Sequence, residues 1–173
     1  GSDRAMTVVL DEPEEGNTSY FYVDANNYND LTNDGGGEWP KGNPTNFIRD
    51  QELQIRYAGD GGETTATYFL RFYRFRDFAT RPDLRDKVLC YRANHREGQI
   101  DLGGKTYRIC IADDDVDGVF DDLERTGLAV DLDGDGQLDG DPAKSGEGFL
   151  ASQVFQVEGR AWKVRSISPA GDL

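Results

Sequence analysis

A single acidic stretch, running from Asp113 to Asp141, limits what this chain can fold into. It holds twelve acidic residues and one basic residue, and so carries most of the chain's formal net charge of −14. Carboxylates gathered this densely repel one another unless cations lie among them. The stretch must therefore stay fully solvated or wrap around bound cations, and its spacing favours bound cations.

The first half of the stretch has the spacing of a twelve-residue calcium loop. Such a loop takes oxygen ligands at positions 1, 3, 5, 7, 9 and 12, with glycine at position 6 and a bidentate glutamate at position 12. Counted from Asp113, Gly118 falls at position 6 and Glu124 at position 12. The other predicted ligands are Asp113, Asp115, Asp117, the backbone carbonyl of Val119, and Asp121. We predict a calcium site here, with a solvated acidic loop as the alternative.

The second half repeats the pattern eighteen residues later. Its predicted ligands are Asp131, Asp133, Asp135, Gln137, Asp139 and Asp141. Position 12 is now Pro142, which has no side-chain oxygen, so Asp141 or Glu147 would have to complete the site. The alternative is a polar turn, which Asp-Gly dipeptides often make. We predict a second calcium site that binds more weakly than the first.

The flanks of both loops indicate strands, whereas an EF-hand has a helix on each side of its loop. Residues 105–111 (KTYRICI) alternate apolar and polar side chains, as strands do. Between the loops, residues 128–130 are too few for a helix. A calmodulin-type switch works by opening a pair of helices, so the loops are predicted to be structural calcium sites.

Two further segments share one hairpin pattern. Residues 100–109 (IDLGGKTYRI) match residues 155–164 (FQVEGRAWKV) at an offset of 55. Each copy reads as a strand, a two-residue turn containing glycine and a returning strand. The first copy leads directly into the acidic stretch.

From about Gly98 onward the chain resembles a module that recurs in secreted and cell-envelope proteins of bacteria. The matching residues are the Gly103–Tyr107 turn region, the Asp113–Asp122 loop and the Asp131–Gly136 loop. The resemblance implies calcium binding outside the cytosol and brings no enzymatic activity. Some proteins with this module also carry thioredoxin-like domains, but no Cys-x-x-Cys motif is present here. The expected location is secreted, periplasmic or at the cell surface.

Composition and pattern together predict an all-β fold, a β-sandwich or open barrel of about ten strands with calcium loops on the strand connections. Residues 1–97 read as a β-rich region of unknown role and residues 98–173 as the hairpin and calcium-loop region, the two packed as one domain. No apolar run is long enough for a transmembrane helix. The acidic balance argues against nucleic-acid binding.

An enzyme is not expected, because no catalytic constellation stands out. His95 is the only histidine, and Cys90 lies five residues before it, on the opposite face of an extended strand. Cys90 and Cys110 lack metal-type spacing and either pair with each other or stay free.

The alternative function is a carbohydrate-binding module that uses Trp39 and the Tyr20–Tyr28 region. Residues 24–46 form a long predicted loop rich in asparagine, and such loops are uncommon unless functional. The candidate ligand-binding residues are Trp39, Tyr22 and Tyr28. A glycan or another envelope protein is therefore the possible partner besides calcium.

Overall fold

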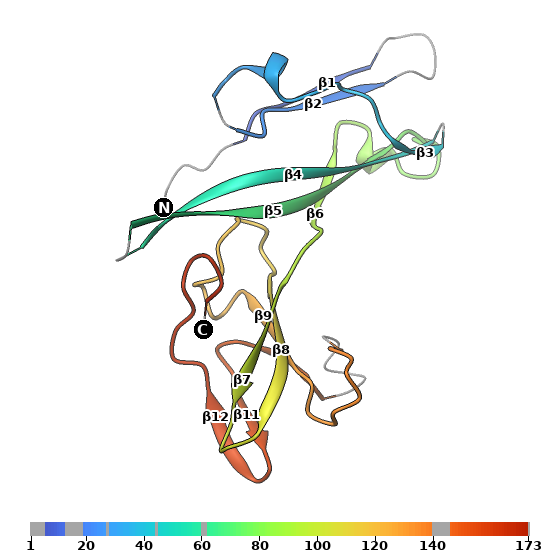
Figure 1. Cartoon of the computed structure of the whole chain (residues 1–173). Helices are drawn as coiled ribbons and strands as arrows, with labels where there is room; N and C mark the ends of the chain where they lie inside the picture. Colours follow the sequence, from blue (N-terminus) through green and yellow to red (C-terminus); the bar gives the residue numbers. More distant parts are fainter. Residues whose placement is uncertain are drawn as a thin grey trace. The chain divides into compact units, whose positions relative to one another are not determined.

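The computed structural model describes residues 6–12, 19–26, 28–43, 45–59, 62–139 and 146–172. Strands make up 48% of it and helical turns 4%, which confirms the predicted all-β class (Figure 1). Within the described residues the strands form four antiparallel sheets, none of them closed into a barrel. This arrangement is consistent with a β-sandwich. In the same residues, no helix reaches the length and apolar character that crossing a lipid bilayer demands.

The chain divides into two compact units. The first comprises Gly1–Arg56 and Thr65–Ala93, and the second comprises Tyr57–Thr64 and Asn94–Leu173. The tip of one long hairpin thus belongs to the second unit, while the rest of that hairpin belongs to the first. The division at residue 97, and packing as one domain, stay predictions.

A two-stranded and a four-stranded sheet build the first unit. Its strands are β1 (Val8–Asp11), β2 (Tyr20–Val23), β3 (Lys41–Asn43), β4 (Asn46–Gly59), β5 (Gly62–Phe75) and β6 (Leu89–Arg92), with helical turns η1 (Leu31–Asn33) and η2 (Pro82–Leu84). β1 pairs with β2, and the larger sheet has the order β3-β4-β5-β6. In that sheet β4 and β5 are neighbours and make one long hairpin.

Aromatic packing joins these two sheets. Phe21 of β2 is fully buried, and its ring centroid lies 4.9 Å from that of Phe72 on β5. Along β5 the even-numbered residues from 68 onward are buried, so alternate side chains face this core while their neighbours face outward. The first unit is a small sandwich whose four-stranded sheet keeps an outward face.

In the second unit, a four-stranded sheet of order β10-β9-β8-β7 stands beside the hairpin β11–β12. The strands are β7 (Arg96–Asp101), β8 (Thr106–Asp113), β9 (Thr126–Val130), β10 (Gly148–Leu150), β11 (Val154–Val157) and β12 (Arg160–Lys163). Both predicted hairpins of the repeat are present, as β7–β8 and β11–β12. Tyr107, Ile109 and Ile111 alternate into the core from β8, and Phe120 is fully buried.

The segment predicted as a continuous loop between residues 24 and 46 has more structure than its composition indicates. It contains η1, capped by Asp30, whose side chain accepts a hydrogen bond from the Thr32 amide at 2.9 Å. It also contains β3, which pairs with the start of β4 through Gly42 and Phe47. Three residues are too few for a period-2 pattern, so β3 left no signal in the sequence.

Candidate metal centre

Antiparallel pairing places the two acidic loops at opposite ends of β8 and β9. Asp113, the last residue of β8, is directly opposite Thr126, the first residue of β9. The first loop therefore spans a closed hairpin base, where the Asp114 amide donates to the Arg125 carbonyl at 2.9 Å. The second loop leaves the other end of β9, where the Asp131 amide donates to the Arg108 carbonyl of β8 at 3.0 Å. The predicted strand flanks are thus present at both loops.

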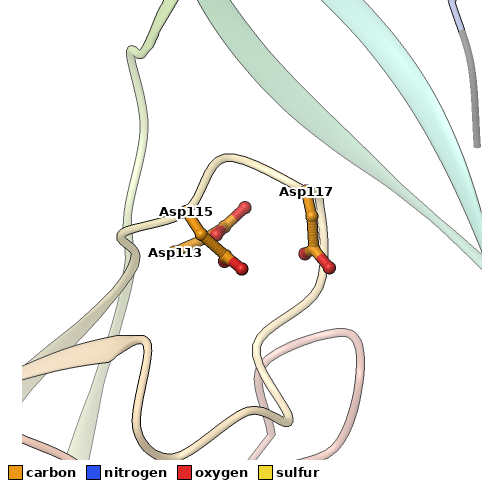
Figure 2. Close-up of side chains that lie close together, drawn as sticks. All are labelled: Asp113, Asp115 and Asp117. Atoms are coloured by element: carbon orange, nitrogen blue, oxygen red, sulfur yellow. The ribbon is translucent and has the colours of Figure 1, made fainter. Parts of the chain in front are cut away.

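Three carboxylates gather in the first loop (Figure 2). One oxygen from each of Asp113, Asp115 and Asp117 lies within 4.8 Å of the others. Asp113 is 1% exposed, whereas the other two are exposed to solvent. Three negative charges at this separation repel one another, so the group has the charge and the oxygen donors to hold a cation.

The second loop contains a matching group. Asp131, Asp133 and Asp135 also bring carboxylate oxygens within 4.8 Å of one another. Here again the first aspartate is buried, with 8% of Asp131 exposed, and the other two are exposed. In each group the first aspartate is therefore the buried one, and the other two are exposed.

Both loops fold around their first aspartate in the same way. The carboxylate of Asp113 accepts hydrogen bonds from the amides of Val116 and Gly118, each at 2.8 Å. The carboxylate of Asp131 accepts from the amides at the same loop positions, Gly134 at 2.8 Å and Gly136 at 3.1 Å. These bonds draw the chain into a turn that points positions 1, 3 and 5 at one another.

Contacts from outside each loop hold its turning glycine. The buried Tyr57 hydroxyl, in the second unit, donates to the Gly118 carbonyl at 2.7 Å. The Arg108 guanidinium donates to the Gly136 carbonyl and forms an ion pair with Glu97. Sequence reasoning missed Tyr57 and Arg108 because both are far from the loops they support.

The ligands predicted at the later positions are placed differently. Glu124 is exposed and lies outside the first carboxylate group, as does Asp121. In the first loop the Arg125 guanidinium lies 3.1 Å from the Asp115 carboxylate, so a cationic side chain already offsets part of the charge. Val119 and Gln137 donate their amides to Asp117 and Asp135, at 2.9 and 2.7 Å.

At the second loop, Glu147 supplies a carboxylate where Pro142 does not. Glu147 is 4% exposed, and its Oε1 accepts hydrogen bonds from the amides of Leu132 at 2.8 Å and Asp133 at 3.3 Å. Its backbone carbonyl also accepts from the Val130 amide at 3.1 Å. Asp139 lies outside the carboxylate group of this loop, and Asp141 lies outside the described residues. Of the two candidates for completing the loop, Glu147 is therefore the one with an observed place on it.

The position-4 residues of the two loops lead to a stability prediction. Both have a positive φ, 60° at Val116 and 78° at Gly134, but only glycine adopts this region without strain. We expect Val116→Gly to raise the free energy of unfolding by about 1 kcal/mol, because relieved strain outweighs the added freedom of the unfolded chain. Urea unfolding measures the change. The control is Val119→Gly in the same loop, which relieves no such strain; equal stability changes in both variants would contradict the explanation.

The aromatic candidates for glycan binding do not share a surface. Trp39 is half-buried, its ring 5.1 Å from Phe21 and 5.8 Å from Phe47, and its Nε1 donates to the Ser19 hydroxyl at 3.3 Å. Phe21 and Tyr22 are adjacent on β2 and so point to opposite faces. Trp39 thus packs on the side of β2 away from Tyr22, while Tyr28 is 70% exposed. The structure gives this group no support as a sugar platform. Cys90 and Cys110 do not form a disulfide with each other.

Comparison of the chain with family models, curated proteins and solved structures finds no match. The functional reading therefore depends on the geometry of the two loops.

Proposed function

We propose that the chain binds two calcium ions in these EF-hand-like loops and that the ions stabilise its fold. The observation that carries the proposal is the shared geometry of the loops. In each, a buried aspartate accepts the amides of positions 4 and 6, and three carboxylates converge within 4.8 Å. The two segments share the Asp-x-Asp-x-Asp-Gly spacing and adopt the same arrangement, as expected if both hold the same kind of ion.

The chemistry of the groups favours calcium over other metals. Each group offers carboxylate oxygens alone, without histidine or cysteine, and transition metals prefer nitrogen or sulfur ligands. Magnesium demands near-ideal octahedral geometry and keeps several waters, whereas calcium accepts six to eight oxygens in flexible arrangements. Loops that add backbone carbonyls and water to three carboxylates suit calcium.

We further propose that the chain belongs to a secreted, periplasmic or cell-surface protein of bacteria. The resemblance of the hairpins and loops to the bacterial envelope module supports this location. Extracellular calcium modules bind with Kd of roughly 10⁻⁴ to 10⁻³ M, and this is the affinity range that we expect for the two loops. The role supported in this setting is structural: calcium holds the acidic connections that join β8, β9 and β10.

Isothermal titration with calcium tests the proposal through a matched pair of variants, Glu124→Gln and Glu147→Gln. Two binding events are expected in the unmodified chain. Glu124→Gln should weaken the tighter event, since the first loop has glutamate at the bidentate position. Glu147→Gln should weaken the other event, and its amide oxygen can still accept the loop amides, so the fold is kept.

Magnesium titration serves as the ion control, and circular dichroism checks the fold of both variants. Absence of any calcium binding would sink the proposal. If Glu147→Gln weakened the tighter event while Glu124→Gln had no effect, two sites would stand but their predicted ranking would be reversed.

A further inference from the structure

An open groove on the first unit is lined by three aromatic side chains. Tyr73 and Phe75 of β5 and Tyr91 of β6 enclose a volume of about 260 Å³. The Tyr73 and Phe75 rings are nearly parallel, 7° apart, with centroids separated by 6.3 Å. The Tyr91 ring stands almost perpendicular to Tyr73, at 86° and 5.4 Å. The groove therefore has two parallel rings and a side wall.

These rings belong to the outward face of the four-stranded sheet. On β5 the buried residues Phe72 and Arg74 alternate with Tyr73 and Phe75, so the latter point away from the sandwich core. Tyr91 is directly opposite Arg71, the residue two positions before Tyr73, and 51% of it is exposed. Core packing thus does not account for the three rings.

Polar groups lie on the same face next to the rings. The Arg71 guanidinium binds the Asp50 carboxylate of β4 through two nitrogens, Nε to Oδ1 and Nη2 to Oδ2, the latter at 2.9 Å. Lys41 Nζ donates to the same Asp50 Oδ2 at 3.1 Å. Because charges of both signs pair with one another here, a charged ligand gains little from this surface.

We propose that this face of β5 and β6 binds a neutral glycan chain. Pyranose rings present apolar C–H faces that pack on aromatic rings, and their hydroxyl groups both donate and accept hydrogen bonds. Tyr73, Phe75 and Tyr91 supply the apolar contacts, while the Arg71–Asp50 pair and the tyrosine hydroxyls serve the sugar hydroxyls. An acidic glycan would be repelled by the net charge of −14, and a cationic ligand would meet Arg71 beside Tyr73.

Native electrophoresis in gels containing a soluble neutral polysaccharide tests the proposal on the full chain with calcium present. The probes are mixed-linkage β-glucan, xylan and galactomannan, each run against a gel without polysaccharide. At least one is expected to retard the chain. Tyr91→Ala and Tyr73→Ala should each weaken retardation by about tenfold, the equivalent of 1.4 kcal/mol. Tyr28→Ala is the matched control, because this exposed tyrosine lies outside the groove.

Folding is checked by the thermal midpoint of each variant, and the half-exposed Tyr91 keeps the test valid if Tyr73→Ala unfolds. Retardation that survives high salt, and that Tyr91→Ala weakens by about tenfold, supports a neutral ligand in the groove. Failure of all three polysaccharides, or equal loss in Tyr28→Ala, overturns the proposal. So does binding of poly-L-proline in their place, or a dimer in analytical ultracentrifugation that Tyr91→Ala converts to a monomer.

Discussion

Replacing Arg74 by methionine should lower the free energy of unfolding by about 4 kcal/mol, within the range measured when one partner of a buried ion pair is removed. Arg74 lies on the core side of β5 with 3% of its side chain exposed. Its Nε and Nη2 bind the two carboxylate oxygens of Glu12, at 3.0 and 2.6 Å. Urea unfolding of the variant and of the unmodified chain measures the loss in the free energy of unfolding.

The size of this effect follows from how many groups depend on one guanidinium. Besides Glu12, Arg74 donates to the backbone carbonyls of Leu84, Arg85 and Lys87, at 2.8, 2.7 and 2.9 Å. Methionine fills similar space but leaves these carbonyls and the carboxylate without their donor. Buried groups that lose a partner incur their full desolvation cost. Arg74 therefore binds Glu12, the residue that follows β1, and the carbonyls around η2, and so keeps both segments against the sheet.

Arg71→Met is the matched control, three residues away on the opposite face. Its ion pair with Asp50 is exposed, so the expected loss in the free energy of unfolding is at most about 1 kcal/mol.

The hydrogen bond from Arg74 also lowers the pKa of Glu12 below its ordinary value of 4.5. A carboxylate with a depressed folded pKa stabilises the fold above the unfolded pKa and loses this contribution as the pH falls through the folded pKa. The difference in free energy of unfolding between Arg74→Met and the unmodified chain should therefore become smaller below about pH 4.5. Equal losses of stability in Arg74→Met and Arg71→Met would contradict the buried role of Arg74.

These arginines also show where the sequence pattern falls short. The interleaving of Arg71, Arg74 and Arg76 with aromatics reads as one polar face that meets carboxylates elsewhere. The carboxylate partners exist, at Asp50 and Glu12. However, side chains three positions apart on a strand point to opposite faces, so Arg71 faces solvent and Arg74 faces the core. The odd or even position of each arginine along the strand can be read from the sequence, whereas the partner of Arg74, 62 residues away, cannot.

Local signals predicted the loops and hairpins well. A turn containing glycine between two alternating runs fixes a hairpin within about ten residues, and the Asp-x-Asp-x-Asp-Gly spacing fixes which carboxylates converge. The position of Glu147 at the second loop depends on a strand pairing between residues far apart in the sequence. It reaches the second loop because Gly148 of β10 pairs with Ala129 of β9, which brings Glu147 beside Val130. A three-residue strand after a long connection carries too little pattern to predict that pairing.

Calcium should raise the thermal midpoint of unfolding relative to EDTA. An ion that binds only the folded chain adds RT ln(1 + [L]/Kd) to its stability, about 2.7 kcal/mol at a free concentration 100 times Kd. Millimolar calcium is expected to give less if the sites bind as weakly as extracellular modules do. Differential scanning calorimetry in EDTA, calcium and magnesium measures the shift, and an unchanged midpoint in calcium would contradict structural metal binding.

Asp113→Ala should remove the first loop's contribution to the calcium-induced rise in the thermal midpoint. It should also destabilise the metal-free chain by about 3 kcal/mol. The buried Asp113 carboxylate accepts the amides of Val116 and Gly118, and hydrogen bonds to a charged group contribute about 1.5–3 kcal/mol each. Asp115→Ala separates the two effects, because Asp115 is an exposed member of the carboxylate group and would contact the ion under the proposed function, while the amides of the turn bind Asp113. The variant should reduce the calcium increment, which is the rise in thermal midpoint from EDTA to calcium. It should change the free energy of unfolding in EDTA by less than about 1 kcal/mol. Asp86→Ala, an exposed aspartate outside both loops, should alter neither quantity. If Asp115→Ala kept the full calcium increment, the converging carboxylates of the first loop would be a fold element and not a calcium site.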